Sequence, residues 1–217
     1  MKGLLVAFNA SYVHTNLAVR LLLEVAERNI DILEMTVNEP TEQCLAKIMK
    51  KSPDFIMYST YIWNWDRVQS MGSYIQKASP EIRQFLGGPE VSFDAPERMK
   101  DHYWIEAILS GEGELSFNNF LDYIEGKISA LSVPGLCYRR EGDIVENPVA
   151  VPLDNLDYLP SVRYSEDMNH RIIYYESMRG CPYHCSYCLS SGDDRVRYRS
   201  VEDIKEDMHH IFQTGTK

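Results

Sequence analysis

The chain has 217 residues, of which 44% are hydrophobic and 25% charged, and this composition is typical of a globular protein with a packed core. Its formal net charge of -10 at pH 7 argues against a nucleic-acid partner and against an anionic membrane surface, because both carry the same sign of charge. No run approaches the roughly 20 apolar residues of a membrane helix and no cleavage-site pattern follows the first apolar run, so we expect a cytoplasmic protein without a membrane segment.

Up to about residue 124, short apolar runs alternate with longer amphipathic stretches, which indicates an α/β domain. Strands are expected at residues 4–8, 31–37, 54–59, 82–86 and 105–110. Helices are expected at residues 17–25, 41–50, 65–77, 96–100 and 114–124. Since connections between parallel strands are right-handed crossovers, residues 1–126 should form an open, five-stranded parallel sheet of the flavodoxin or Rossmann type, with helices on both faces.

After residue 126 the character of the sequence changes. Residues 135–138 and 144–145 flank a turn at Gly142 and predict a small β-hairpin. Residues 151–164 contain two prolines and no sustained periodicity, so a β-hairpin and a surface linker are expected over 127–170. An apolar strand at 171–176 and a helix at 201–212 follow. One strand and one helix cannot bury a hydrophobic face alone, so 171–217 is expected to begin a truncated barrel.

Cysteine usage separates two single residues from a cluster. The chain contains five cysteines, an odd number, and three of them lie within eight residues, which does not resemble a secreted disulfide framework. Cys44 and Cys137 stand alone in apolar surroundings and are expected to be core residues.

The clustered residues Cys181, Cys185 and Cys188 have the spacing Cys-x3-Cys-x2-Cys. Thiolates are soft ligands that suit zinc or iron–sulfur clusters. Three thiolates on one loop can each bind one iron of a cubane and leave the fourth iron open to a substrate. The alternative is a structural zinc site with His184 as the fourth ligand, although ligation from inside the loop would be strained.

This motif resembles that of the radical S-adenosylmethionine enzymes, which have the same spacing and an aromatic residue before the third cysteine, here Tyr187. The resemblance implies that Cys181, Cys185 and Cys188 hold a 4Fe-4S cluster, and that S-adenosylmethionine binds the open iron beside Tyr187. It also implies reductive cleavage of S-adenosylmethionine to methionine and a 5'-deoxyadenosyl radical. The electron would come from a partner such as flavodoxin or ferredoxin.

The front part resembles the cobalamin-binding subgroup of that family in a five-stranded domain and four short stretches. These stretches are Gly87-Gly88-Pro89-Glu90, Gly111-Glu112-Gly113-Glu114, Val133-Pro134-Gly135-Leu136 and Leu156-Asp157-Tyr158-Leu159-Pro160. Proteins of this kind are often labelled magnesium-protoporphyrin IX monomethyl ester oxidative cyclase. The resemblance implies cobalamin as a cofactor, and methyl transfer, oxidative cyclisation or rearrangement of a small-molecule substrate.

A ligand of an open parallel sheet lies beyond the carboxyl ends of the strands, where the strand order reverses. The loops at 9–16, 59–61, 87–90 and 111–113 fall at that edge, and their glycines would let a flat ligand approach the backbone. We therefore expect cobalamin to contact Ser59, Thr60, Tyr61, Gly87, Gly88, Pro89, Gly111, Glu112 and Gly113. Trp63 and Trp65, which follow Tyr61 closely, either wall such a ligand or belong to the core.

One departure and two alternatives remain. The cobalamin pattern Asp-x-His-x-x-Gly, which supplies a histidine to cobalt, is absent, and His14 is expected to be an ordinary loop residue. A transfer-RNA methylthiotransferase shares the cysteine motif but carries three further cysteines in its front domain, where this chain has only Cys44 and Cys137. The non-enzyme alternative is a cobalamin-binding or interaction module with a structural zinc site.

Overall fold

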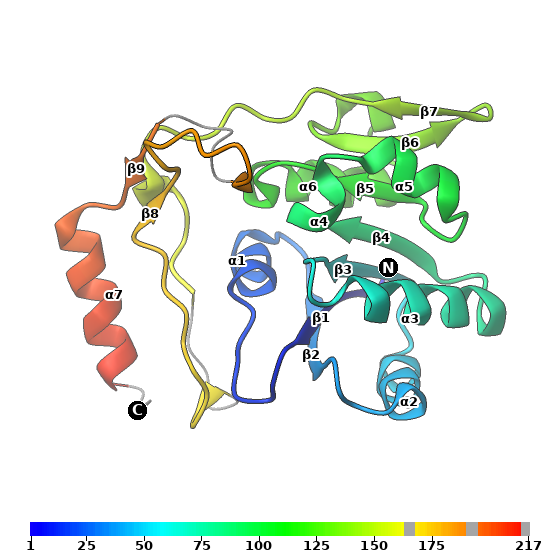
Figure 1. The fold of residues 1–217 in the computed structure, drawn as a ribbon, viewed down its shortest axis with the longest axis horizontal. Helices are drawn as coiled ribbons and strands as arrows, with labels where there is room; N and C mark the ends of the chain where they lie inside the picture. The colour runs from blue at the N-terminus through cyan, green and yellow to red at the C-terminus, as the bar shows by residue number, and fades with distance from the viewer. Residues whose placement is uncertain (163–167, 190–194, 214–217) are drawn as a thin grey trace.

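The computed structural model describes residues 1–162, 168–189 and 195–213, and its centre is a seven-stranded sheet in the order β2-β1-β3-β4-β5-β6-β7 (Figure 1). The parallel strands are β1 (Gly3–Asn9), β2 (Ile30–Thr36), β3 (Phe55–Ser59), β4 (Arg83–Gly87) and β5 (Ala107–Leu109). The strand order reverses between β1 and β3, which is the switch point of a flavodoxin-like sheet. The predicted α/β class and parallel sheet are confirmed.

Helices cover both faces of this sheet, as alternating side chains of buried strands require (Figure 1). Within β1, Leu5 and Ala7 pack into the core beneath α1 and α6, whereas Leu4, Val6 and Phe8 pack into the core on the other face. The first face is covered by α1 (Leu17–Val25) and α6 (Gly113–Ile124). The second is covered by α2 (Thr41–Lys51), α3 (Trp65–Ala78), the unpredicted short helix α4 (Pro89–Ser92) and α5 (Ala95–Asp101).

Two asparagines fix the carboxyl edge of the sheet near the switch point. The side chain of Asn16 accepts a hydrogen bond from the backbone N–H of Val19 at 3.1 Å and so caps α1. The Nδ2 of Asn64 donates to the carbonyl oxygens of Phe8 (3.2 Å) and Ser59 (3.0 Å). Asn64 therefore holds the ends of β1 and β3 together, where a ligand is expected.

The hairpin extends the sheet and does not stand apart from it, which corrects the prediction of a five-stranded sheet followed by a separate hairpin. β6 (Leu136–Arg140) pairs antiparallel with β5, and β7 (Asp143–Glu146) pairs antiparallel with β6. The open edge of β5 offers unpaired N–H and C=O groups, and β6 satisfies them while burying Leu136, Cys137 and Tyr138. A 3-10 turn, η1 (Ala130–Ser132), precedes it.

The linker is less exposed than its composition suggests. Within the described residues it has little regular structure beyond the 3-10 turn η2 (Leu156–Tyr158), but the side chains of Leu156, Leu159 and Val162 are buried. The surface location predicted for the linker is therefore wrong for these three residues, because they supply apolar contacts to the front domain and the C-terminal part. Residues 163 and 164 of the predicted linker lie outside the described residues.

The strand predicted at 171–176 is wrong. Residue Ile172 makes one isolated bridge to His14, and the first regular strand is β8 (Met178–Arg179), which pairs antiparallel with β9 (Arg197–Tyr198). A strand needs a neighbour along its length as well as apolar residues, and Ile172 and Tyr174 are largely exposed here. The predicted last helix is present as α7 (Val201–Gln213). Among the described residues no helix is long and apolar enough to cross a membrane.

Candidate cofactor site

A cavity of about 720 Å³ lies at the carboxyl ends of β3, β4 and β5, below α1. Its inner part is apolar and is lined by Leu5, Val19, Leu22, Met57 and Leu109. Charged and polar groups, Ser59, Glu112, Arg179 and Arg197 among them, also line it. An apolar interior with a few polar groups, at this volume, is typical of a cofactor site.

This cavity brings together most of the residues that the sequence predicted for the front domain. Its lining includes Ser59, Tyr61, Gly87, Gly88, Pro89, Gly111, Glu112 and Gly113. Thr60 does not line it: the side chain is fully buried and its Oγ1 donates to the carbonyl of Tyr58 at 3.4 Å. The side chain of Thr60 therefore stabilises the β3 turn and does not face the cavity.

Gly88 is required by the packing of the backbone at the rim. Its φ is +111°, and a Cβ atom there would lie 2.9 Å from the backbone nitrogen of Thr60 and closer still to the Thr60 carbonyl oxygen. The backbone of Thr60 in turn donates to Gly87 at 2.8 Å. The sequence interpretation, that this glycine serves the approach of a ligand, is therefore replaced by a packing requirement between two loops.

The aromatic residues after β3 divide between the cavity and the core. The Tyr61 ring stacks on Trp63 with 4.3 Å between centroids, and Tyr61 lines the cavity. Burial raises the pKa of the Tyr61 hydroxyl, and the nearby carboxylate of Glu176 raises it further, so the group stays protonated and able to donate. Trp65 instead packs under the guanidinium of Arg98, 4.7 Å from its ring, and does not line the cavity.

The 9–16 loop, expected at the ligand edge, does not line the cavity and binds the C-terminal part. His14 Nδ1 lies 2.6 Å from the hydroxyl of Tyr174, and Thr15 donates to the carbonyl of Ile172 at 2.9 Å. The buried carboxylate of Glu34 contacts Arg20 at 2.5 Å and Arg171 at 2.9 Å. These contacts hold the segment before the cysteine motif against the first domain.

The outer wall of the cavity comes from segments that follow the sheet. Val149, Ala150 and Pro152 of the linker line it, together with Arg179, Gly180, Leu189 and Arg197. Gly180 precedes Cys181 directly, so the cysteine loop begins at this wall. Sequence reasoning missed these residues, because no spacing pattern relates them to loops more than 60 residues earlier.

The three predicted ligand cysteines lie on a segment without helix or long strand. The thiols of Cys181 and Cys185 are half-buried and Cys188 is exposed. Over the described ranges no three Cys, His, Asp or Glu side chains are grouped closely enough to hold a metal ion. The donor set suits an iron–sulfur cluster chemically, and the thiols have to converge before they can hold one. Tyr187 is 90% exposed and does not line the cavity.

The two remaining cysteines are core residues, as predicted. Both Cys44 and Cys137 are fully buried in the core between the sheet and its α2, α3 face. Burial raises the pKa of the Cys137 thiol to about 12. Neither thiol is exposed to a second metal cluster.

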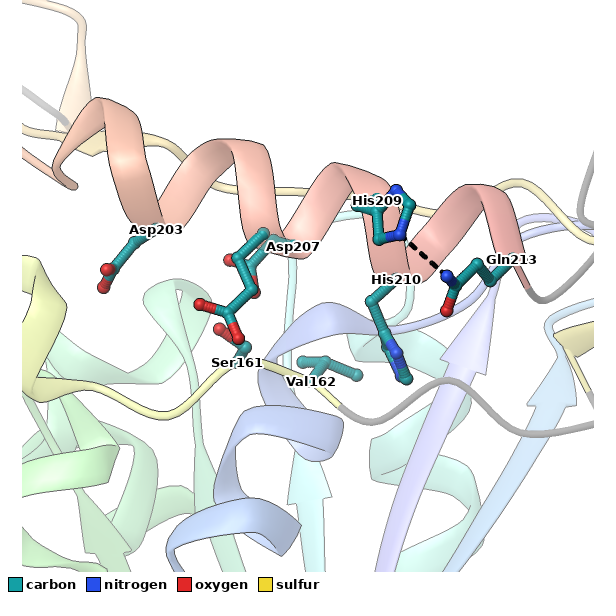
Figure 2. A pocket seen from close by; sticks show the side chains of 8 residues that line it. Ser161, Val162, Asp203, Asp207, His209, His210 and Gln213 are labelled. Carbon is teal, nitrogen blue, oxygen red and sulfur yellow. Dashed lines mark hydrogen bonds between the residues drawn. The ribbon is translucent and has the colours of Figure 1, made fainter.

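A second cavity, of about 530 Å³, separates α7 from the linker (Figure 2). It is lined by Ser161, Val162, Asp203, Glu206, Asp207, His209, His210 and Gln213. Figure 2 shows His210 pointing from α7 toward Val162, while His209 contacts Gln213 at 2.7 Å. Asp207 accepts a hydrogen bond from the Tyr175 hydroxyl at 2.8 Å. The described lining residues form no metal-ligating group of three, so this cavity is not a metal centre.

The parallel sheet, its switch point and the cavity at its carboxyl edge define a cofactor-binding α/β domain of the doubly wound class. Residues 3–121 match the B12-binding domain family, and the chain belongs to this family.

The relatives are enzymes that act with cobalamin or transfer methyl groups, by their names. An uncharacterized methyltransferase of Pyrococcus horikoshii, PH0819, is 26% identical over 203 residues, with 88% of this chain and 44% of the relative covered. The cobalamin-dependent radical SAM methyltransferase TokK of Streptomyces tokunonensis is 28% identical over 163 residues, with 70% and 24% covered. The anaerobic magnesium-protoporphyrin IX monomethyl ester cyclase of Rubrivivax gelatinosus is 28% identical over 166 residues, with 71% and 30% covered. The chain thus spans less than half of each relative.

A solved structure shares the fold over nearly the whole chain. The cobalamin-dependent S-adenosylmethionine radical enzyme OxsB, solved with aqua-cobalamin and S-adenosylmethionine, superposes with a TM-score of 0.81 at 18% identity, covering 99% of this chain and 32% of that one. The predicted resemblance to cobalamin-dependent radical S-adenosylmethionine proteins is confirmed at the level of family and fold.

Proposed function

We propose that this chain carries the cobalamin-binding and cluster-binding parts of a radical S-adenosylmethionine enzyme that transfers a methyl group to a small-molecule substrate. The observation that carries the proposal is the shared wall: the cavity of a B12-binding domain is closed by Arg179 and Gly180, directly before Cys181. Such an arrangement places two cofactors side by side in one site.

The cavity residues suit a large amphipathic cofactor. The apolar side chains of Leu22, Met57 and Leu109 would exclude water from one face of the ring, while Ser59 and Tyr61 offer hydroxyls to polar amide or nucleotide groups. The raised pKa of Tyr61 keeps its hydroxyl a donor at neutral pH. Cobalamin supplies a cobalt-borne methyl group, and S-adenosylmethionine at a 4Fe-4S cluster supplies the radical that opens an unreactive C–H bond.

The cysteine loop would hold the cluster through its three thiolates. The only backbone hydrogen bond between described residues of the loop 181–189 runs from Cys188 to Cys185 at 3.0 Å, so the thiols can converge without breaking regular structure. The match to the Pyrococcus horikoshii methyltransferase spans 88% of the chain and so has to include this loop. Electrons would come from a flavodoxin- or ferredoxin-like partner.

Methyl transfer is the preferred reaction because two of the three relatives above are methyltransferases by name. Oxidative cyclisation is the second candidate, favoured by the similarity to the Rubrivivax cyclase. The methylthiotransferase alternative loses support, because Cys44 and Cys137 are buried apart from the loop and cannot serve a second cluster. A product assay of the complete enzyme that detects a methylated substrate would support the first of these reactions.

Cobalamin binding is tested by blocking the cavity. Hydroxocobalamin is mixed with the chain, the mixture is desalted, and the protein fraction is examined by absorption. Ala150→Trp, in the linker wall, should abolish retention, whereas Val151→Trp, at a residue that is 81% exposed and outside the lining, should retain it. A colourless wild-type fraction, or equal retention by both variants, would contradict the proposed site.

Cluster binding is tested by anaerobic reconstitution with iron and sulfide. The wild-type chain should acquire broad absorption near roughly 400 nm that bleaches on reduction, as iron–sulfur clusters do. Cys185→Ala should not acquire it, and Cys44→Ala should behave as the wild type because Cys44 is a core residue. Recovery of zinc alone, with no iron-dependent absorption, would favour the structural zinc site.

A further inference from the structure

Two arginines join the start of the cysteine loop to the wall of the cofactor cavity. Arg179 and Arg197 are directly opposite each other in the β8–β9 pair, and both line the cavity. Their side chains are 13% and 6% exposed, so their charges have to be met by protein groups. The groups that meet them come largely from the β5–α6 loop.

Arg179 spans three carboxylates. It contacts Glu114 at 2.5 Å, Glu112 at 3.2 Å and Glu176 at 2.7 Å. Arg197 also binds Glu112, with 3.2 Å between Nη1 and Oε2. The planar guanidinium, with five N–H donors, makes this shared arrangement possible, which a lysine ammonium cannot reproduce.

The acceptors of these arginines sit on the loop that the ligand has to touch. Glu112 and Glu114 flank Gly113, and Gly111, Glu112, Gly113 and Glu114 all line the cavity. On the other side, Gly180 has a φ of +89°, and a Cβ on it would clash with the carbonyl oxygen of Arg195. The chain therefore passes from Arg179 into Cys181 through a turn that is held rigidly against β9.

We propose that Arg179 is a positioning residue that couples the two cofactors, so that filling the cavity with cobalamin favours cluster assembly on the cysteine loop. This inference rests on the proposed function. A ligand in the cavity fixes the 111–114 loop, the loop fixes Arg179, and Arg179 fixes the first ligand cysteine. Since the thiols are not grouped beforehand, a fixed end lowers the ordering cost of bringing them together. By linkage, the cluster strengthens cobalamin binding by the same factor.

The test measures this factor directly. Hydroxocobalamin is titrated into the 217-residue chain before and after anaerobic cluster assembly, and the ratio of the two Kd values is the coupling factor. For the wild type we expect a factor of about 5 to 150, the usual span of coupling between sites. Arg179→Gln should bring the factor close to 1 while each cofactor still binds alone, and Arg179→Lys should give an intermediate value.

Arg28 provides a matched control. It also contacts three carboxylates, of Glu27, Asp122 and Glu125, but does not line the cavity. Arg28→Gln removes the same charge and should leave the coupling factor at the wild-type value. If Arg179→Gln does not fold, Glu114→Gln carries the test, because it removes the acceptor and keeps the shape of the side chain.

The outcomes separate the two claims. A wild-type chain that binds no cobalamin overturns the proposed function and this inference with it. A wild-type chain that binds both cofactors with a coupling factor of 1 overturns this inference alone. Equal coupling in wild type, Arg179→Gln and Glu114→Gln also overturns it, because the arginine would then have only a structural role, visible in thermal unfolding but not in coupling.

Discussion

Replacing Gly88 by alanine perturbs the cavity rim at its tightest point. The φ of +111° suits only glycine, and the atoms that a Cβ would meet belong to the Thr60 backbone, which cannot swing aside. Gly142 is the matched control: its φ is +96°, but nothing lies within 4 Å of the position its Cβ would take. The two substitutions thus share backbone strain and differ in the clash.

The expected magnitudes follow from these two contributions. Backbone strain of this kind costs about 1–3 kcal/mol, and this is the whole expected effect of Gly142→Ala. Overpacking against an unyielding neighbour adds about 1–3 kcal/mol, so Gly88→Ala should lower the free energy of unfolding by about 2–6 kcal/mol. Because Gly88 lines the cavity and Gly142 lies in the β6–β7 turn, only Gly88→Ala should weaken cobalamin binding.

Urea unfolding of both variants at 25 °C, followed by hydroxocobalamin titration, measures the two quantities. The midpoint of Gly88→Ala should fall clearly below that of Gly142→Ala at an unchanged slope. Equal midpoints for the two variants, with wild-type affinity for hydroxocobalamin in both, would refute the packing argument for the rim.

Three further outcomes are expected. Glu34→Ala leaves two partly buried arginines without their shared carboxylate and should cost about 3–5 kcal/mol in urea unfolding, whereas an effect below 1 kcal/mol would show that the ion cluster does not hold the C-terminal segment. The thiol of Cys137 titrates near 12 when folded and near 9 when unfolded, so stability should fall as pH rises from 9 to 12; Cys137→Ala should reduce that slope by up to about 1.4 kcal/mol per pH unit, and an unchanged slope would count against the buried thiol. Iodoacetamide should label the three loop cysteines of the native metal-free chain and spare Cys44 and Cys137, as peptide mass spectrometry would show; equal labelling of Cys44 would contradict its burial.

The sequence was sufficient for the parallel core because burial on both faces leaves a strong signal. The continuous apolar runs at β1 and β3 have no polar alternation, and each is buried along its whole length. The loops at Gly87 and Gly111 could be placed at one edge for the same reason, since parallel strands bring their carboxyl ends together. Local composition and topology rules together therefore predicted most of the cavity lining.

What could not be predicted depends on contacts between distant segments. Residues 171–176 look like a strand, but no neighbouring strand pairs with their full length, and pairing is not encoded in the segment itself. The contact of Arg179 with Glu114 joins residues 65 positions apart. The acidic pair in Gly111-Glu112-Gly113-Glu114 and the arginine beside the cysteine motif were visible, and their opposite charges were the one available signal.

The central claim is that one chain holds cobalamin and a 4Fe-4S cluster across a shared wall. The most direct measurement is cobalt and iron analysis of the same desalted sample after anaerobic reconstitution with iron, sulfide and hydroxocobalamin. The account predicts about one cobalt and about four iron atoms per chain, with the iron lost in Cys185→Ala and the cobalt lost in Ala150→Trp. A wild-type sample that retains neither metal, or in which both substitutions leave the metal content unchanged, would contradict it.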